Sequence, residues 1–306
     1  MAGSKERDRR RARERYERQR QLQSERRRKF RQRSLIALAV VCVLGLAGGL
    51  TALFAGGSTS KASSKPKSTA SASPSASASA SATASAAAVA EPATHCTYTT
   101  KGVAPAAKKV SLPPAVPNYK ATYTAAIHTN LGTIDINLLN SKATCTVNSF
   151  VHLANAGYFN ASQCHRVTTS GGLYVLQCGD PYAKASEKLT CSQGTDSPGT
   201  GGPGYEFANE NLPAGASSSA TVTYKAGTVA MANSGGSDTN GSQFFLVYKN
   251  STLGPDYTPF GTITSGLDIL QKVANAGTSC TYSGSGPGDG APKEKVIINS
   301  VTIKQT

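Results

Sequence analysis

The chain has 306 residues and a formal net charge of +15, and residues 1–33 alone carry +10 of it. The rest of the chain is close to neutral, which argues against a body built to bind nucleic acid. Only 16% of the residues are charged, Trp is absent and Gly is abundant. This composition excludes a helical bundle or coiled coil and favours strands joined by tight turns.

The first 33 residues form a basic tail that has no apolar face and cannot bury a core. One interpretation of the tail is a topology signal that rests on anionic lipid headgroups. The other is binding to nucleic acid or to a protein partner, but no aromatic platform or folded motif accompanies the charge. We therefore favour the topology signal and expect no binding to nucleic acid.

The next segment is apolar: residues 35–55 contain Thr51 as their only clearly polar member. A helix of this length, at about 1.5 Å per residue, spans a hydrocarbon core of roughly 30 Å. A cleaved signal sequence usually has a shorter apolar run of about 7–15 residues, and a buried core helix rarely runs this far without a charge. We predict an uncleaved membrane anchor in residues 34–56. The Lys and Arg residues before it place the N-terminus in the cytoplasm and the remaining chain outside the membrane.

A tract of Ser, Ala, Thr, Pro and Lys follows in residues 57–93 and offers no side chains for a hydrophobic core. Such a composition is typical of a flexible, disordered spacer. We assign residues 57–118 to this linker and its lead-in. Residues 119–306 then form the folded domain, which we expect to be monomeric.

Seven cysteines occur, and six of them follow the predicted anchor. An even number of cysteines in an exported segment is typical of disulfides, although buried free thiols remain an alternative. Six cysteines allow 15 complete connectivities. Cys96 and Cys280 have similar neighbours and bracket the folded region, so we predict a bridge between them. There is no C-x-x-C pair and no His spacing suited to a metal ion, and we expect neither a metal site nor a cofactor.

The folded region opens with two alternating runs, Tyr123–Ile127 and Ile134–Leu138, on either side of a turn at Asn130–Gly132. This pattern predicts a β-hairpin. Residues 146–154 then carry apolar side chains at the spacing of one helix face, and this helix should stop at Gly157.

Further along the chain, residues 266–274 predict a second helix, with Thr264 or Ser265 as its cap. Short β-like runs predict further strands at residues 173–177, 227–233, 243–248 and 296–304. Many strands with two helices indicate a mainly β fold, a closed barrel with helices covering its ends.

Four motifs follow one another in this region. The run Cys164–Val167, continued by residues 176–181, comes first, and residues 199–205 come second. The third and most specific joins residues 227–233 to residues 240–245, and Pro259–Gly261 completes the set. In type and order these motifs resemble those of the cyclophilin family over about residues 120–306. The resemblance implies an eight-stranded antiparallel barrel capped by two helices, which agrees with the elements above.

The resemblance also implies a peptidyl-prolyl cis-trans isomerase that acts on proline-containing peptides and assists the folding of exported proteins. Arg166 is the only arginine after residue 33. Its planar, permanently charged guanidinium would act as the catalytic group. It would donate a hydrogen bond to the prolyl carbonyl and favour a pyramidal proline nitrogen. The substrate-binding residues implied by the family motifs are Tyr174, Val175, Gln177, Ala232, Asn233, Gln243, Phe245, Leu253 and Tyr257.

The sequence departs from the family at the walls of this site. Tyr174 and Val175 stand where the family usually has Phe and Met, and Tyr257 stands where a His is common. Residues inserted between Asp180 and Gly199 include Cys191, so a disulfide could fasten this loop near the site.

Two other functions compete with the isomerase. A proline-segment binding module with little or no turnover is favoured by the altered wall of the site, whereas the retained Arg166 favours catalysis. A hydrolase that uses His165 would need a nucleophile, and no G-x-S-x-G pattern occurs.

Overall fold

The structure is a computed structural model that describes residues 91–192, 194, 196–213 and 220–306. The predicted basic tail, the anchor at residues 34–56 and most of the spacer lie outside the described residues. Within the described part of the chain, no helix combines the length and the apolar character needed to cross a membrane.

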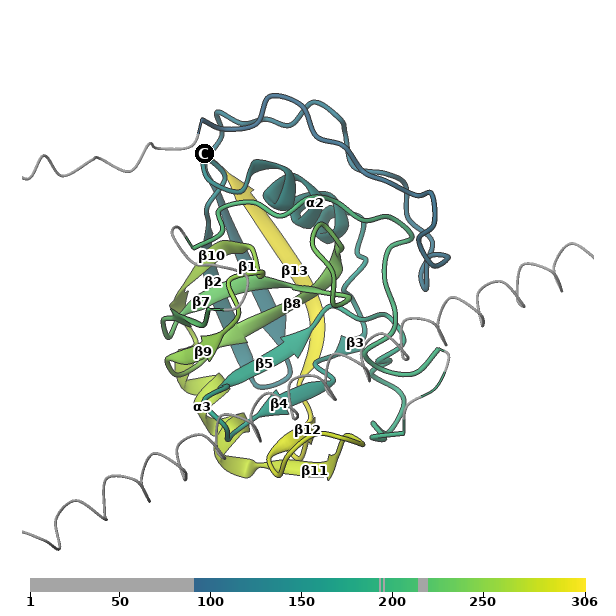
Figure 1. The fold of residues 1–306 in the computed structure, drawn as a ribbon, viewed down its shortest axis with the longest axis vertical. Helices are drawn as coiled ribbons and strands as arrows, with labels where there is room; N and C mark the ends of the chain where they lie inside the picture. The colour runs from purple at the N-terminus through teal and green to yellow at the C-terminus, as the bar shows by residue number, and fades with distance from the viewer. Residues whose placement is uncertain (1–90, 193, 195, 214–219) are drawn as a thin grey trace, which may run out of the picture. The chain divides into compact units, whose positions relative to one another are not determined.

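The described residues are mainly β, as the sequence predicts, with helices at opposite ends of the strands (Figure 1). The two helices are α2 (Thr144–Asn155) and α3 (Leu267–Ala276). The strands are β1 (Tyr123–Thr129), β2 (Gly132–Leu138), β3 (Ser162–Gln163), β4 (Arg166–Thr168), β5 (Val175–Cys178), β6 (Val222–Tyr224), β7 (Thr228–Asn233), β8 (Asn240–Val247), β9 (Ser251–Leu253), β10 (Pro259–Ser265), β11 (Thr278–Thr281), β12 (Asp289–Pro292) and β13 (Ile297–Gln305).

The strands pair into one eleven-stranded sheet and one separate pair. The large sheet has the order β11-β12-β4-β5-β8-β7-β10-β2-β1-β13-β3, and its end strands are not paired with each other; β6 pairs with β9. The predicted closed eight-stranded barrel is therefore corrected to an open order of strands. The interruption lies at Cys164 and His165, the two residues between β3 and β4. On one side of them β3 pairs with β13, and on the other side β4 pairs with β5.

The predicted hairpin is confirmed as β1 and β2, which pair from Tyr123–Leu138 to Thr129–Gly132. Its apolar side chains alternate with the pleat, so that Ile127, Ile134 and Ile136 all point into the core and are almost fully buried.

The two helices also agree with the sequence pattern, although their ends are held in unexpected ways. At α2, Glu210 accepts hydrogen bonds from the backbone N–H groups of Cys145 and Thr146, so a distant carboxylate caps the positive end of the helix. At α3, the prediction of Thr264 or Ser265 as cap is wrong. Gly266 occupies that position with φ +85°, a conformation that glycine adopts without strain, and the two polar residues belong to β10.

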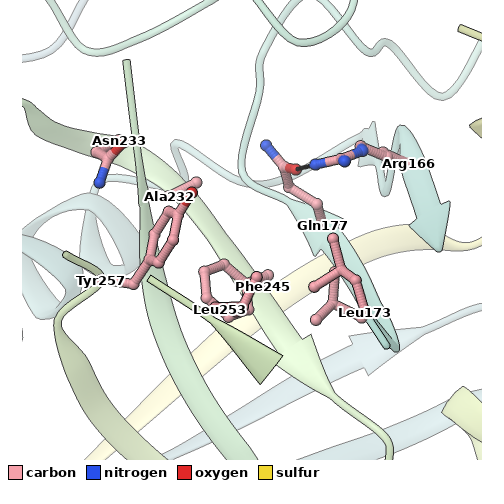
Figure 2. A pocket seen from close by; sticks show the side chains of 9 residues that line it. Arg166, Leu173, Gln177, Ala232, Asn233, Phe245, Leu253 and Tyr257 are labelled. Carbon is pink, nitrogen blue, oxygen red and sulfur yellow. Dashed lines mark hydrogen bonds between the residues drawn. The ribbon is translucent and has the colours of Figure 1, made fainter. Parts of the chain in front are cut away.

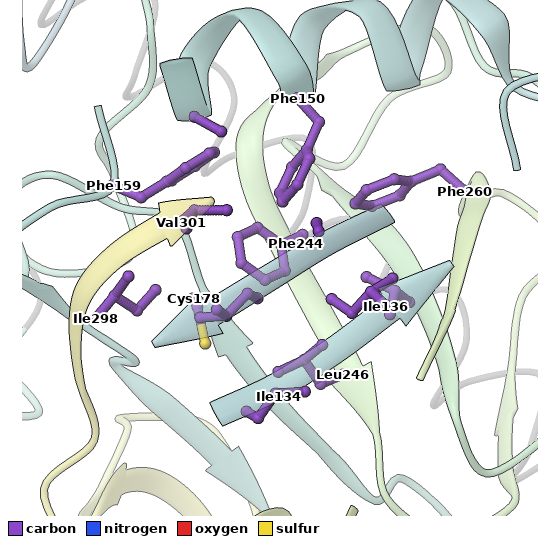
Figure 3. Packing of buried hydrophobic residues seen from close by; sticks show 14 of the residues in the cluster. Ile134, Ile136, Phe150, Phe159, Cys178, Phe244, Leu246, Phe260, Ile298 and Val301 are labelled. Atoms are coloured by element: carbon purple, nitrogen blue, oxygen red, sulfur yellow. The ribbon is translucent and has the colours of Figure 1, made fainter. Parts of the chain in front are cut away.

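The core is centred on aromatic rings from α2, β8, β10 and the segment after α2 (Figure 3). Phe150 lies 5.3 Å from Phe159, 5.6 Å from Phe244 and 5.2 Å from Phe260, measured between ring centroids. These four rings join α2 to the sheet that carries the pocket described below.

Three disulfides connect the described residues: Cys96–Cys145, Cys164–Cys178 and Cys191–Cys280. The predicted Cys96–Cys280 bridge is wrong. Similar neighbouring residues do not decide pairing, because a disulfide needs its two Cα atoms within about 7 Å of each other, and only the tertiary fold sets that distance.

The first of these bridges fastens the segment before β1 to the domain. Cys96 is joined to the N-terminus of α2, and Tyr98 donates a hydrogen bond to the carbonyl oxygen of Cys145 over 2.9 Å. Further on, Thr99 forms an isolated β-bridge with Glu206. Much of the segment that precedes the predicted domain boundary is thus bonded to the domain.

Candidate functional site

The sheet has two apolar faces, and the alternation of side chains along each strand assigns residues to one or the other. In β8, Phe244 and Leu246 join the main core, whereas Phe245 and Val247 form part of a second, smaller cluster. In β5, Leu176 belongs to the main core and Val175 to the second cluster. The second cluster lies beneath a surface pocket.

This pocket has a volume of about 100 Å³. Figure 2 shows its walls, which are apolar on one side and polar on the other. Pockets for drug-sized ligands are usually about 300–1,000 Å³, so the size suits a single side chain or ring. The lining residues are Arg166, Leu173, Val175, Gln177, Ala232, Asn233, Phe245, Leu253 and Tyr257.

Strand register explains why residues so distant in sequence meet here. Arg166 on β4 pairs with Gln177 on β5, Gln177 pairs with Phe245 on β8, and Phe245 pairs with Ala230 on β7. These four residues form a row across neighbouring strands on one face of the sheet. The row runs from the charged group at one side of the pocket to its apolar floor.

Arg166 lies at the polar side of the pocket with its side chain 30% exposed. Its Nε and Nη2 donate to the two carboxylate oxygens of Asp289 over 2.7 and 2.8 Å, and its Nη1 donates to Oε1 of Gln177 over 3.1 Å. A guanidinium has five N–H groups. Among the described residues, one N–H on Nη1 and one on Nη2 have no partner and remain available to a ligand.

The charge of Arg166 is stabilised where it lies. Burial on its own lowers the pKa of the guanidinium, but the hydrogen bonds and charge of Asp289, followed by Tyr257 and Tyr282, outweigh it and raise the pKa above its ordinary value. Arg166 is therefore protonated near pH 7.

A chain of side-chain amides continues from Arg166 away from the pocket. Gln177 donates through Nε2 to Oε1 of Gln243 over 2.9 Å, and Gln243 donates through Nε2 to the carbonyl oxygen of Gly201 over 2.9 Å. Arg166 can only donate and the carbonyl of Gly201 can only accept, so both ends require the same orientation of the two amides. Gln243 thus holds Gln177, and through it one edge of Arg166.

The predicted binding residues are placed as follows. Seven of the nine line the pocket: Val175, Gln177, Ala232, Asn233, Phe245, Leu253 and Tyr257. Gln243 lies behind Gln177 and does not line it. Tyr174 faces the other side of the sheet, where it packs against the main core and lies 6.1 Å from Tyr248 between ring centroids.

Leu173 lines the pocket in place of Tyr174 and is not among the predicted residues. Leu173, Val175 and Gln177 are separated by two residues each, so the strand pleat turns them to the same face. Gln177 is placed by the first sequence motif. Counting back from it in steps of two residues would have selected Leu173 as a lining residue and rejected Tyr174.

The apolar wall opposite Arg166 consists of aromatic and aliphatic side chains. The rings of Phe245 and Tyr257 meet edge to face with centroids 5.4 Å apart. Asn233 lies at the rim, where its side chain donates to the carbonyl oxygen of Asp256 over 3.0 Å. The oxygen of the same amide accepts a hydrogen bond from the backbone N–H of Gly235 over 3.1 Å, so both ends of the amide are engaged within the protein.

His165, next to Arg166, is fully enclosed. Neither ring nitrogen has a hydrogen-bond partner among the described residues. Burial, followed by the charge of Arg166, lowers the pKa of His165 to about 3, so the imidazole is neutral near pH 7. Within the described part of the chain, no group of three or more His, Cys, Asp or Glu side chains is placed to hold a metal ion.

The sequence model of the family "Cyclophilin type peptidyl-prolyl cis-trans isomerase/CLD" matches residues 124–303, which contain every residue of the pocket. The chain belongs to this cyclophilin-type family. The matched range also contains β2 to β12, all of β1 except Tyr123, and most of β13.

Two relatives come from mycobacteria. The chain is 47% identical over 206 residues to a "Probable peptidyl-prolyl cis-trans isomerase B" of Mycobacterium leprae, which covers 65% of this chain and 63% of the relative. It is 45% identical over 206 residues to the protein of the same name in Mycobacterium tuberculosis, covering 65% of this chain and 60% of the relative. The alignments therefore span less than two thirds of the length of these relatives.

Among solved structures, a Cryptosporidium parvum cyclophilin type peptidyl-prolyl cis-trans isomerase aligns with a TM-score of 0.44 and 23% identity. The alignment covers 60% of this chain and 99% of that one.

Proposed function

We propose that this protein is a peptidyl-prolyl cis-trans isomerase that acts on X–Pro bonds of exported proteins and assists their folding. The observation that carries the proposal is the position of Arg166. The only arginine after residue 33 lies beside an apolar pocket of about 100 Å³ with two N–H groups free of partners in the described structure. Membership of the cyclophilin-type family supports the same reaction.

The reaction needs little from the protein beyond placement of a donor. Rotation about a peptide bond has a barrier of about 18–20 kcal/mol because resonance gives the C–N bond partial double-bond character. In the twisted state this resonance is lost and the proline nitrogen becomes pyramidal. A donor that binds more strongly to the twisted state than to either planar isomer lowers the barrier.

Arg166 is the proposed donor. Its two free N–H groups point along the side of the guanidinium that Asp289 and Gln177 leave unused, and they would donate to the prolyl carbonyl of the substrate. Charge-assisted hydrogen bonds of this kind contribute about 1.5–3 kcal/mol. Since about 1.4 kcal/mol corresponds to a factor of ten in rate, each such bond is sufficient for about a tenfold to hundredfold effect.

The apolar wall supplies the second requirement, a slot without water for the proline ring. Phe245 forms its floor and is only 4% exposed, while Leu173 and Leu253 close its sides. Water excluded from this slot cannot compete for the donors of Arg166, and a low local dielectric strengthens their hydrogen bonds to the substrate.

The test is a protease-coupled peptide assay on the full-length protein. Arg166→Ala should lower kcat/KM for an X–Pro peptide about 10²–10³-fold, in line with the loss of a single transition-state donor elsewhere. Lys184→Ala removes an exposed cation that pairs with Glu187 and does not line the pocket, and it should leave the rate unchanged. If wild type and Arg166→Ala both run at the uncatalysed rate, the isomerase is excluded.

A proline-segment binding module is the second candidate. The pair with Asp289 favours it, since a carboxylate at 2.7 Å offsets the guanidinium charge that would face a substrate. Binding of a labelled X–Pro peptide, followed by fluorescence anisotropy beside the turnover assay, separates the two functions. Retained binding with turnover at the uncatalysed rate in wild type identifies the module.

The proposed location is a single-pass anchor in residues 34–56 with the domain outside the membrane. Three disulfides within the described residues support exposure to an oxidising compartment, because such bonds seldom persist in the cytosol. Membrane fractionation with carbonate extraction, combined with protease treatment of intact cells, tests this. Release of the protein by carbonate, or protection of the domain from the protease, contradicts the proposed location.

A further inference from the structure

The carboxylate of Asp289 holds one whole edge of the Arg166 guanidinium. Oδ1 accepts from Nε over 2.7 Å and Oδ2 accepts from Nη2 over 2.8 Å, a two-point contact that fixes the plane of the guanidinium as well as its position. Both side chains are largely shielded from solvent, with 30% and 18% of their surfaces exposed. A pair in this setting is geometrically better defined than a surface ion pair.

Asp289 can act as a support because its own strand is anchored. It is the first residue of β12 and pairs with Thr168 on β4, two residues beyond Arg166. The next residue, Gly290, pairs with Val167 and lies so close to β11 that an added methyl group would overlap the carbonyl oxygen of Cys280. The register of β12 between β4 and β11 is therefore set by close backbone contact.

The hairpin formed by β11 and β12 is also tied to the segment that carries Arg166. The hydroxyl of Tyr282 donates to the carbonyl oxygen of His165 over 2.9 Å. Before β12, the backbone N–H of Thr169 donates to the carbonyl oxygen of Gly288 over 2.8 Å. These contacts flank Arg166 on both sides, so the distance between β12 and β4 has little freedom.

We infer that Asp289 is a positioning residue of the isomerase, which holds Arg166 so that its two free N–H groups face the proline slot. The inference rests on the proposed function. An Arg side chain loses rotational freedom about several bonds when it becomes ordered. The pair with Asp289 orders the side chain of Arg166 before a substrate binds. Arg166 is thereby ready to stabilise the twisted peptide without rearrangement in the transition state.

The experiment is a double-mutant cycle on the full-length protein. Asp289→Asn keeps the shape of the side chain but removes its charge and one acceptor. It should lower kcat about tenfold and leave KM close to wild type, because Arg166 acts in the transition state. In the Arg166→Ala background the same substitution should cause no further loss. Asp268→Asn, the same change at an exposed position of α3, is the matched control and should leave kcat unchanged.

A spectroscopic readout tests placement independently of turnover. The ¹⁵N resonance of Arg166 Nε–H is assigned as the signal that disappears in Arg166→Lys. In wild type the proton on Nε should exchange slowly with solvent, and in Asp289→Asn the same proton should exchange at least tenfold faster. Asp289→Glu, which keeps the charge, should recover part of kcat and is the second variant if Asp289→Asn does not fold.

Each outcome decides the inference. Asp289→Asn with wild-type or increased kcat, beside a strongly impaired Arg166→Ala, overturns the positioning role and leaves the proposed function intact. Equal losses from Asp289→Asn in both backgrounds also overturn it, because a merely structural role would act without Arg166. If Arg166→Ala retains a wild-type kcat that exceeds the uncatalysed rate, the proposed role of Arg166 as the donor fails instead. If both proteins run at the uncatalysed rate, the proposed function fails.

Discussion

Gln177 and Gln243 are joined by a single hydrogen bond of 2.9 Å between their side-chain amides, and only one of them lines the pocket. Gln243 therefore affects a ligand through Gln177 and Arg166. The family motif marks both glutamines alike, but the structure separates their tasks.

This relationship predicts the effect of an isosteric change at the hidden member of the pair. Gln243→Glu replaces the donor that faces the carbonyl oxygen of Gly201 by an acceptor, so the bond to Gly201 is lost. The carboxylate would still accept from Gln177, but it would no longer be anchored to Gly201 at its other end. We therefore expect kcat/KM to fall about tenfold, which corresponds to about 1.4 kcal/mol. Gln271→Glu, at an exposed position of α3, is the control in the same peptide assay. Equal rates for the two variants would contradict the amide chain.

The adjacent residues Phe244 and Phe245 should give opposite phenotypes because they lie on opposite faces of β8. Phe244→Ala removes a ring from the main core and should cost about 3–5 kcal/mol in the free energy of unfolding. Phe245→Ala opens the floor of the slot and should raise KM for an X–Pro peptide about tenfold or more. Urea denaturation and peptide kinetics on both variants check this. A larger effect on KM from Phe244→Ala would reverse the assignment of the two faces.

The buried imidazole of His165 predicts a pH dependence of stability. Its pKa is lowered from 6.5 to about 3, so below pH 6.5 the unfolded chain binds a proton that the folded protein does not. The free energy of unfolding should therefore decrease as the pH falls from 6.5 towards 3, with a slope approaching 1.36 kcal/mol per pH unit from this residue. His165→Leu should lack this part of the slope in urea titrations between pH 7 and pH 4. A parallel pH profile for the two proteins would rule out the buried neutral imidazole.

The disulfide Cys191–Cys280 connects the inserted loop to β11, next to the strand that carries Asp289. Replacing both cysteines by Ala should lower the free energy of unfolding by about 2–5 kcal/mol and should also lower kcat/KM, since it loosens the hairpin that supports Asp289. The matched control is removal of Cys96–Cys145, which lies at α2. That variant should be less stable, yet its kcat/KM should equal that of wild type below the unfolding transition. The same loss of kcat/KM in both variants would show that the hairpin has no separate part in catalysis.

Much of the domain could be predicted from local patterns. Alternation along β1 and β2, and helical spacing in α2, depend on neighbours within a few residues, and sequence displays these directly. The short strands β3, β4, β11 and β12 were not predicted. They are too short for a pattern to repeat. They form because β13 offers a partner to β3 and β5 offers one to β4, after which β12 pairs with β4 and β11 pairs with β12.

By itself, then, the sequence determined the mainly β character and the two helices of the described domain. It also singled out Arg166 as the candidate catalytic group, because arginine occurs only once after residue 33. Only the tertiary structure decided that Cys280 pairs with Cys191 and that Asp289 holds Arg166. Asp289 lies 123 residues from Arg166 in the chain, and no local pattern connects them. Such pairs are set by strand register, which depends on the packing of the whole sheet.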